Sequence, residues 1–453
     1  MKILTAKYVV PIASDPVING AVAIDGHEVA AVGTAYSLTE KYPTAHIDDF
    51  GEAAILPGFV NCHSHLEVTA MRGSLDNVEN DFYKWLITLT KLRGEVLSDD
   101  DINIAALAGA VEGARAGVTC FGDIGRMGTA GFEALTRVGL RGVLFQETEF
   151  SADSKTAAAD FEALLEEFEA LSSDSTDLVE VGLSPHAPYT VSRDLFEKIA
   201  RFGLDRKIKI SIHAAESQEE DDLLRNGTGF FTSVYEKFGV TWDSPLCSSI
   251  EFLDQTGILE TQPLLAHCIK VSDGDIDILT KRGASVAHCP KSNAKFGHGY
   301  APFETMVDSG INVGLGTDSV ASNNMCDLLD EARHAAFAAR NRSDKKRFIS
   351  ERDVLYAATL GGAKALGFAD RIGSLEPGKQ ADIAVINLKN IAQQPVSDIY
   401  AALVFSSNAR DVSMTMVAGK EIYRNNEVPT ADEQMIHARL NEIGEKIINS
   451  GLT

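Results

Sequence analysis

The chain has 453 residues, of which 45% are hydrophobic, and its formal net charge is −24 at pH 7. This length exceeds one ordinary domain and fits a barrel with insertions or a small companion domain. An acidic protein lacks the basic face that nucleic-acid polymers and anionic membranes require, so we expect a small-molecule substrate.

Neither a signal peptide nor a membrane span is predicted, because no basic start precedes an apolar run and no run approaches about 20 apolar residues. The six cysteines form no C-x-x-C pair and lie mostly in apolar segments, as reduced core thiols do. These features predict a cytoplasmic protein, and a homo-oligomeric state stays open.

Short strands separated by turns are predicted at the start of the chain. They cover Lys2–Val10, Ala21–Ile24, Glu28–Gly33 and Ala53–Leu56. Turn residues such as Asp25-Gly26 lie between them, which is typical of a small β unit.

From residue 57 onward, predicted strands alternate with helical crossovers. The strands are Gly117–Phe121, Leu178–Leu183, Ile208–Ile212, Leu264–Ala266, Ala284–Ala287 and Ile311–Thr317. The crossovers include Asp99–Ala116, Phe161–Leu171, Ser192–Phe202, Gln218–Asn226, Asp273–Arg282, Phe303–Gly310 and Met325–Arg340. This alternation predicts an α/β fold in which residues 57–370 form a (β/α)8 TIM barrel.

After the barrel the pattern returns to β. The stretch Gly373–Ile386 is followed by a predicted hairpin with strands Val412–Val417 and Glu421–Tyr423. We expect residues 1–56 and 371–425 to form one small β-sandwich domain. The remaining residues, 426–453, are predicted to form a helical tail.

The sequence Pro57-Gly58-Phe59-Val60-Asn61-Cys62-His63-Ser64-His65 places two histidines at the end of an apolar strand. Side chains two positions apart on a strand point the same way, so His63 and His65 project together. Such a pair can begin a metal site, although alone it fits two incidental histidines equally well.

Further polar side chains follow later strands. His213, His267, His288 and Asp318 each come after a short apolar run. The C-terminal ends of barrel strands meet at one rim, so we expect these residues to meet in space. Histidines without this context, such as His298, are interpreted as ordinary.

This set of side chains predicts one divalent cation. The imidazoles of His63, His65 and His213 with the Asp318 carboxylate favour Zn²⁺, with Fe²⁺ as the alternative, over Mg²⁺ or Ca²⁺. Ser184 follows the strand at which a two-metal barrel site would place a bridging lysine, so a single ion is expected. Water on zinc has a pKa of about 7 and supplies hydroxide at neutral pH.

Proton carriers are expected beside the ion. Glu216, three residues after His213, could protonate a ring nitrogen while hydroxide attacks the adjacent carbon, as in nucleobase deamination. His267 could polarise the hydroxide or act as a further ligand, and Asp318 could accept the proton of water.

Substrate contacts are expected from other residues at the rim. His186 and His288 suit substrate binding as well as catalysis. The candidates for the pocket lining, each equally compatible with packing, are Trp85, Ser322, Tyr189 and Arg72.

These motifs, in this order, resemble the deaminase and chlorohydrolase branch of the amidohydrolase superfamily over nearly the whole chain. The similar stretches are residues 57–65, His213-Ala214-Ala215-Glu216, Ala266-His267-Cys268, and residues 288–293, 316–324 and 373–386. The resemblance implies a distorted (β/α)8 barrel and hydrolytic loss of ammonia, or less often halide, from an aromatic N-heterocycle.

The resemblance also implies roles for individual residues. One Zn²⁺ or Fe²⁺ would be held by His63, His65, His213 and Asp318. Glu216, His267 and Asp318 would move protons, and His186 would contact the substrate.

Two groups within this branch act on an adenine ring. Methylthioadenosine/S-adenosylhomocysteine deaminases usually carry an acid shortly after the tryptophan matching Trp85, where this chain has Gly94 and then Glu95. They also carry an arginine pair where this chain has only Arg141. Aminodeoxyfutalosine deaminases are more similar at His65-Leu66-Glu67, so an aminodeoxyfutalosine-like nucleoside is favoured.

Other activities stay open on the same fold. Deamination of guanine, pterins or triazines, and dechlorination, use the same attack by a metal-bound hydroxide. A non-catalytic relative that acts in assembly typically lacks metal ligands, whereas every expected ligand is present here.

Overall fold

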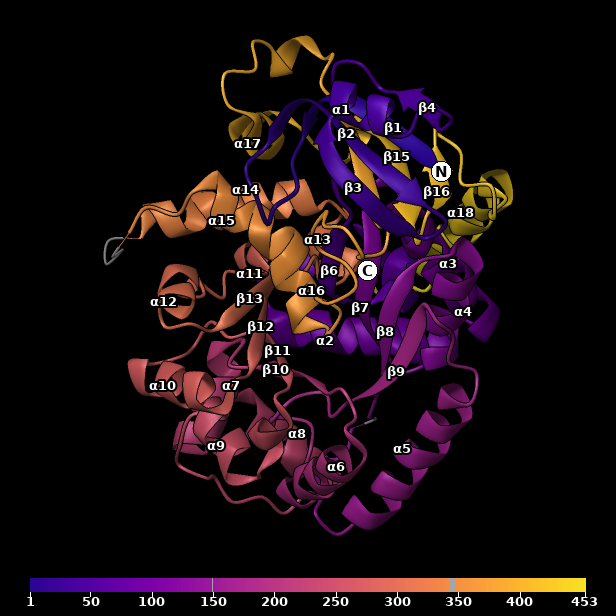
Figure 1. The fold of residues 1–453 in the computed structure, drawn as a ribbon. Coiled ribbons are helices and arrows are strands. Elements are labelled where there is room, and N and C mark those ends of the chain that lie inside the picture. Colours follow the sequence, from indigo (N-terminus) through magenta and orange to yellow (C-terminus); the bar gives the residue numbers. More distant parts are fainter. Residues whose placement is uncertain (149, 343–346) are drawn as a thin grey trace.

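The computed structural model describes residues 1–148, 150–342 and 347–453 (Figure 1). A barrel of eight parallel strands lies at the centre of this described part. The strands are β6 (Phe59–Ser64), β7 (Val118–Gly125), β8 (Arg141–Glu147), β9 (Val179–Ser184), β10 (Ser211–Ala214), β11 (Leu264–His267), β12 (Ser285–His288) and β13 (Asn312–Leu315). The predicted α/β barrel class is confirmed.

The barrel closes irregularly. Its strands hydrogen-bond in two four-stranded sheets, β6-β7-β8-β9 and β10-β11-β12-β13. A single parallel bridge between Leu183 and Ile210 joins the two sheets on one side. On the other side, the Asp318 amide donates to the His63 carbonyl oxygen over 2.9 Å. Because few hydrogen bonds join the two sheets, the barrel is distorted.

Helices surround the barrel because its strands are buried on both faces and need cover outside. β7 and β8 are buried along their whole lengths. The helices are α2 (Phe82–Lys91), α3 (Asp99–Arg115), α4 (Gly128–Val138), α5 (Ala157–Ser172), α6 (Arg193–Arg206), α7 (Gln218–Asn226), α8 (Phe230–Phe238), α9 (Ser249–Gln255), α10 (Asp273–Arg282), α11 (Pro290–Lys295), α12 (Phe303–Asp308), α13 (Val320–Asn323), α14 (Leu328–Asn341), α15 (Glu351–Tyr356) and α16 (Gly362–Ala365).

Strands from both ends of the chain build a second sheet, which lies beside the barrel (Figure 1). Its strands are β1 (Lys2–Val9), β2 (Val17–Asp25), β3 (Glu28–Thr34), β4 (His46–Asp49), β5 (Ala53–Pro57), β14 (Ile383–Asn387), β15 (Val412–Val417) and β16 (Lys420–Arg424). β14 pairs antiparallel with β5, so the two ends of the chain are joined directly.

The alternation of side chains along β5 connects this sheet to the barrel. Ala53 and Ile55 belong to an apolar cluster that also holds side chains from β1 and β14, whereas Ala54 and Leu56 belong to the large cluster around the barrel. The two sets face opposite sides of one strand, as a period of two requires. Both faces of β5 are therefore buried.

The C-terminal helix α18 (Glu433–Asn449) packs beside α3 (Figure 1). Asp101 of α3 is fully buried and accepts hydrogen bonds from Lys446 and Arg439 of α18. Within the described ranges, every helix is too short or too polar to span a bilayer.

Several barrel elements, the strand β8 and the helices α2 and α4 among them, are absent from the sequence-based expectations. β8 begins at Arg141 and ends at Gln146-Glu147, so its apolar centre is short. Its polar ends are buried because other elements supply partners for them: Asp382, next to β14, for Arg141, and Arg126, after β7, for Glu147. The periodicity of the isolated segment therefore carries a weak strand signal.

Candidate active site

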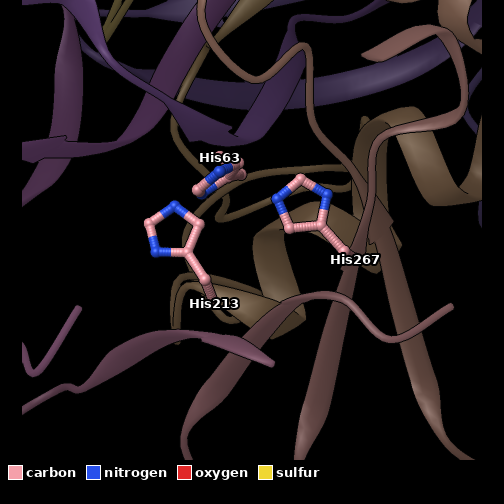
Figure 2. A group of neighbouring side chains, drawn as sticks. All are labelled: His63, His213 and His267. Atoms are coloured by element: carbon pink, nitrogen blue, oxygen red, sulfur yellow. The ribbon is translucent and has the colours of Figure 1, made fainter. Parts of the chain in front are cut away.

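The four predicted metal ligands lie together at the C-terminal rim of the barrel. His63 Nε2 is 3.4 Å and His65 Nε2 is 3.6 Å from Asp318 Oδ1. His65 Nε2 is 3.2 Å from His213 Nε2. Figure 2 shows the rings of His63, His213 and His267 turned towards a shared space, although they come from three different strands. Two overlapping groups, one of His63, His213 and His267 and the other of His63, His65 and Asp318, each bring three ligand atoms within 4.8 Å of one another, close enough to hold an ion.

The hydrogen bonds of the imidazoles leave donor atoms for a metal. His65 Nδ1 donates to the Ile124 carbonyl oxygen, and His213 Nδ1 donates to the His186 carbonyl oxygen, each over 3.0 Å. In the neutral rings Nε2 then keeps its lone pair. Neither ring nitrogen of His63 has a hydrogen-bond partner among the described residues, although the ring is fully buried. Such buried, unpaired nitrogens fit a cation.

The protonation states agree with this interpretation. Burial lowers the pKa of His63 to about 4, so its ring is neutral at pH 7. Burial also holds the pKa of His213 well below its usual range. For Asp318, burial opposes ionisation, but the imidazoles of His63, His267 and His65 outweigh it and hold the pKa well below its usual range. The cluster thus offers neutral nitrogens and one carboxylate.

Asp318 is held in place by three donors. Ser292 and Ser322 hydroxyls donate to Oδ2 over 2.6 and 3.0 Å, and the Ser319 amide donates to Oδ1 over 2.7 Å. Ser322, expected in the substrate pocket, is buried behind the carboxylate and is not part of the cavity lining.

Glu216 lies next to His267 beside the cluster. Its Oε1 is 3.6 Å from His267 Nε2 and 3.9 Å from His298 Nε2. Burial raises the pKa of Glu216 to about 7. The Asn293 side-chain oxygen accepts from His267 Nδ1 over 3.0 Å and orients that ring. A carboxyl group with this pKa can both give and take a proton at neutral pH.

The backbone at this rim has an uncommon conformation. Ala215, His267 and Asp318 have φ angles of 53°, 73° and 58°, the left-handed region that side chains other than glycine rarely adopt. The buried Glu220 carboxylate accepts from the Ala215 and Glu216 amides, each over 2.9 Å. Such conformations persist where surrounding contacts enforce them, and they cluster at active sites.

A cavity next to the cluster is lined by both apolar and charged side chains. The apolar residues include Phe82, Trp85 and Phe296, which contact one another ring to ring. The charged residues include Arg93 and Glu147. The cavity thus combines a flat apolar surface with polar groups, as small-molecule sites do.

Comparison with known proteins identifies the fold family. Residues 54–422 match the amidohydrolase family. The chain belongs to this family. The 5-methylthioadenosine/S-adenosylhomocysteine deaminase of Pelotomaculum thermopropionicum is 30% identical over 433 residues, which cover 95% of this chain and 94% of the relative. The 5′-deoxyadenosine deaminase of Methanobrevibacter smithii is 29% identical, with 95% of this chain and 94% of the relative covered.

Solved amidohydrolase structures agree with the architecture. An adenosine deaminase from Xanthomonas campestris with bound zinc aligns with a TM-score of 0.84 and 26% identity, covering 99% of this chain and 98% of that chain. The Helicobacter pylori aminofutalosine deaminase in complex with methylthio-coformycin aligns with a TM-score of 0.80 and 23% identity, covering 93% and 100%. The predicted membership of the superfamily is confirmed, and this amidohydrolase is a hydrolytic enzyme.

The remaining predicted residues of the amidohydrolase lie at different depths. His186, Trp85 and Tyr189 line the cavity. His288 is buried beneath the rim, where its ring stacks on Phe303 at a centroid distance of 5.6 Å, and it is not part of the lining. Arg72 pairs with Glu112 of α3 and is not part of the lining.

Several cavity residues escape the sequence analysis. Glu147 ends the unpredicted strand β8, and its Oε1 lies 3.9 Å from His186 Nε2. The same strand-end reasoning that found His213 would have found Glu147. Arg93 lies in the π-helical turn Leu92–Val96 that continues α2, and Arg126 follows β7, so the strand-end pattern of the predicted histidines does not mark Arg93. His298 lies on a loop but reaches Glu216.

Proposed function

We propose that this amidohydrolase is a metal-dependent aminohydrolase that removes the amino group from the adenine ring of a nucleoside and releases ammonia. The single observation that carries the proposal is Glu216, a buried carboxyl group beside His267 and next to a cluster able to hold a metal. The deaminases among the relatives support the same reaction class, hydrolysis of a carbon–nitrogen bond in a cyclic amidine.

His63, His65, His213 and Asp318 would hold the ion. Three nitrogens and one carboxylate favour Zn²⁺, and the zinc in the adenosine deaminase structure supports this choice over Fe²⁺. When bound, the ion makes water acidic enough to act as a nucleophile near neutral pH.

The side chains around the ion handle the protons. The overall reaction adds water across the C–N bond, so that the ring carbon gains oxygen and the amino group leaves as ammonia. The Glu216 carboxyl donates its proton to the adjacent ring nitrogen, while Asp318 and His267 accept the proton of the attacking water. That proton then passes to the departing amino group, and the hydroxyl proton left on the ring carbon returns to Glu216 as the carbonyl forms, so the side chains end the cycle as they began.

The cavity orients the base. The apolar rings of Trp85 and Phe296 suit the flat face of a purine, and Trp85 Nε1 is buried without a partner among the described residues. His186 Nδ1 contacts Thr190 Oγ1 over 2.7 Å, which leaves Nε2 as its atom for a substrate. These groups support an adenine-type nucleoside, with methylthioadenosine, S-adenosylhomocysteine and aminodeoxyfutalosine as the candidates.

An ammonia-release assay tests the proposal. Zinc-loaded protein is incubated with these three nucleosides, adenosine, guanine, a pterin and an amino-triazine, and metal-free protein serves as the control. We expect ammonia from adenine nucleosides only with metal. Release from guanine, pterin or triazine alone would overturn the substrate class, and no metal-dependent release from any compound would overturn the deaminase assignment.

A further inference from the structure

The charged residues that line the cavity include an arginine that is anchored along only one edge. Arg93 lies in the turn Leu92–Val96 that follows α2, and its Nη1 donates to Glu67 Oε1 over 2.6 Å. Glu67 is almost fully buried, and its Oε2 accepts from the Met127 amide over 3.0 Å. Both carboxylate oxygens are therefore occupied, and Arg93 is fixed to a rigid partner.

The other edge of the guanidinium is open. Among the described residues, no hydrogen bond joins Nε or Nη2 of Arg93 to the protein, and neither atom is buried without a partner. The residue lines the cavity, and 13% of its side chain is exposed. Nε–H and Nη2–H lie on the same side of the planar group, where they match the two oxygens of a carboxylate.

The position of Arg93 differs from what the resemblance implies. The acid expected to bind ribose hydroxyls falls near Gly94 and Glu95, but Glu95 is exposed and is not part of the cavity lining. Arg93, two residues earlier, lines the cavity instead. At the place of the expected acid, the lining thus offers the hydrogen-bond donors of Arg93.

We propose that Arg93 forms a subsite for a carboxylate on the sugar-side substituent of the nucleoside substrate. The inference rests on the proposed function, because it assumes that the base occupies the metal end of the cavity. The protein carries a net charge of −24, so an anionic substituent needs a local, fixed cation. A guanidinium already held by Glu67 binds with little loss of side-chain freedom.

A matched pair of substrates tests the subsite. One is a 5′-thioadenosine with an S-carboxyalkyl chain, and the other is its carboxamide, which has the same shape without the charge. Two chain lengths are compared. We expect kcat/KM of the wild-type protein to favour the acid by about tenfold or more, as a charge-assisted bidentate pair predicts.

The variants are chosen so that the buried Glu67 carboxylate is never left without an ion-pair partner. In Glu67→Gln/Arg93→Gln both charges are removed together, and the preference for the acid is expected to disappear. Arg93→Lys keeps the charge without the planar fork and should retain part of the preference. Arg282→Gln, which removes a surface arginine paired with Asp254, is the control and should keep the full preference.

Each result bears on a definite claim. Equal use of acid and amide by the wild-type protein, or a preference that survives in the double variant, would overturn the subsite while leaving the deaminase assignment intact. Rejection of both chain-bearing compounds by a protein that deaminates adenosine would also overturn it. Failure with every adenine nucleoside would instead overturn the proposed function.

Discussion

Burial acts in opposite directions on the acids and bases of this site. It lowers the pKa of His63 to about 4 and raises that of Glu216 to about 7, because a low dielectric disfavours the charged form of each group. Asp318 differs because imidazoles surround it and keep it ionised. Two carboxyl groups in one cavity thus have different protonation states, which separates a ligand from a proton carrier.

Replacing Glu216 with glutamine tests its role as a proton carrier. The amide keeps the shape and cannot transfer a proton, so turnover should fall by roughly 10²–10⁴, the effect of losing a general acid–base. Glu216 is not among the expected ligands, so the bound metal, measured by elemental analysis, should stay at the wild-type level. Turnover within a few-fold of wild type would contradict the assignment.

Replacing His63 with alanine tests the ligand set. We expect metal content and activity to be lost together, because the fully buried ring belongs to both groups of side chains, the one with His267 and the one with Asp318, that could hold the ion. His27→Ala, at an exposed histidine in the turn between β2 and β3, is the matched control and should retain both. A His63→Ala protein that remains loaded with metal and active would remove His63 from the site.

Buried carboxylates on neighbouring elements accept hydrogen bonds from the loops that carry the site residues. Asp123, at the end of β7, accepts from the Ser64 hydroxyl and the Leu66 amide, the two neighbours of His65. Glu220, in α7, accepts from the Glu216 amide. The catalytic loops are therefore positioned by the elements that follow them in the fold, independently of any ligand.

Glu331 of α14 likewise positions the loop that carries Asp318 through hydrogen bonds. Its Oε1 accepts from Asn323 over 2.6 Å, and Asn323 in turn donates to the Thr317 carbonyl oxygen. Its Oε2 accepts from the Lys291 amide over 3.2 Å. Burial raises the pKa of Glu331 to about 8.

This raised pKa predicts a pH-dependent contribution to stability. The folded protein binds the Glu331 proton more tightly than the unfolded chain does, so the contribution is complete below the unfolded pKa and is lost as pH rises through about 8. Glu331→Gln cannot ionise, so its melting temperature relative to wild type should rise between pH 5.5 and pH 9. A difference that stays constant over this range would contradict the raised pKa.

Local sequence predicts an element well when its own pattern decides the structure. The segments Gln218–Asn226 and Asp273–Arg282 become α7 and α10 with unchanged bounds, and Ser217 and Ser272 cap them. The strand β8 is not predicted from the sequence, because its polar ends need partners from distant elements. In the site, strand-end residues such as Asp318 are predictable, whereas Arg93 depends on how a turn packs against Glu67.

At the scale of the molecule, one buried ion pair connects the barrel to the sheet built from both chain ends. Arg141, at the start of β8, donates through Nε to Asp382 Oδ2 over 3.0 Å, just before β14. Both side chains are at most 1% exposed. Asp382 also accepts from the Ala418 amide at the turn between β15 and β16. Arg141 is thus at the opposite end of β8 from Glu147 and the cavity, which explains why it takes no part in the site.

Breaking this pair should destabilise the whole protein rather than one part. Arg141→Met leaves the Asp382 carboxylate buried and unpaired, which costs about 3–5 kcal/mol in comparable pairs. We expect a clear fall in melting temperature, and we expect Arg141→Met/Asp382→Leu to recover part of it because no charge is left alone. Arg352→Met, which breaks an exposed pair with Asp15, should cost only about 0–1 kcal/mol. If Arg141→Met melted like Arg352→Met, the ion pair would not hold the barrel and the sheet together, and their shared apolar contacts along β5 would have to do so alone.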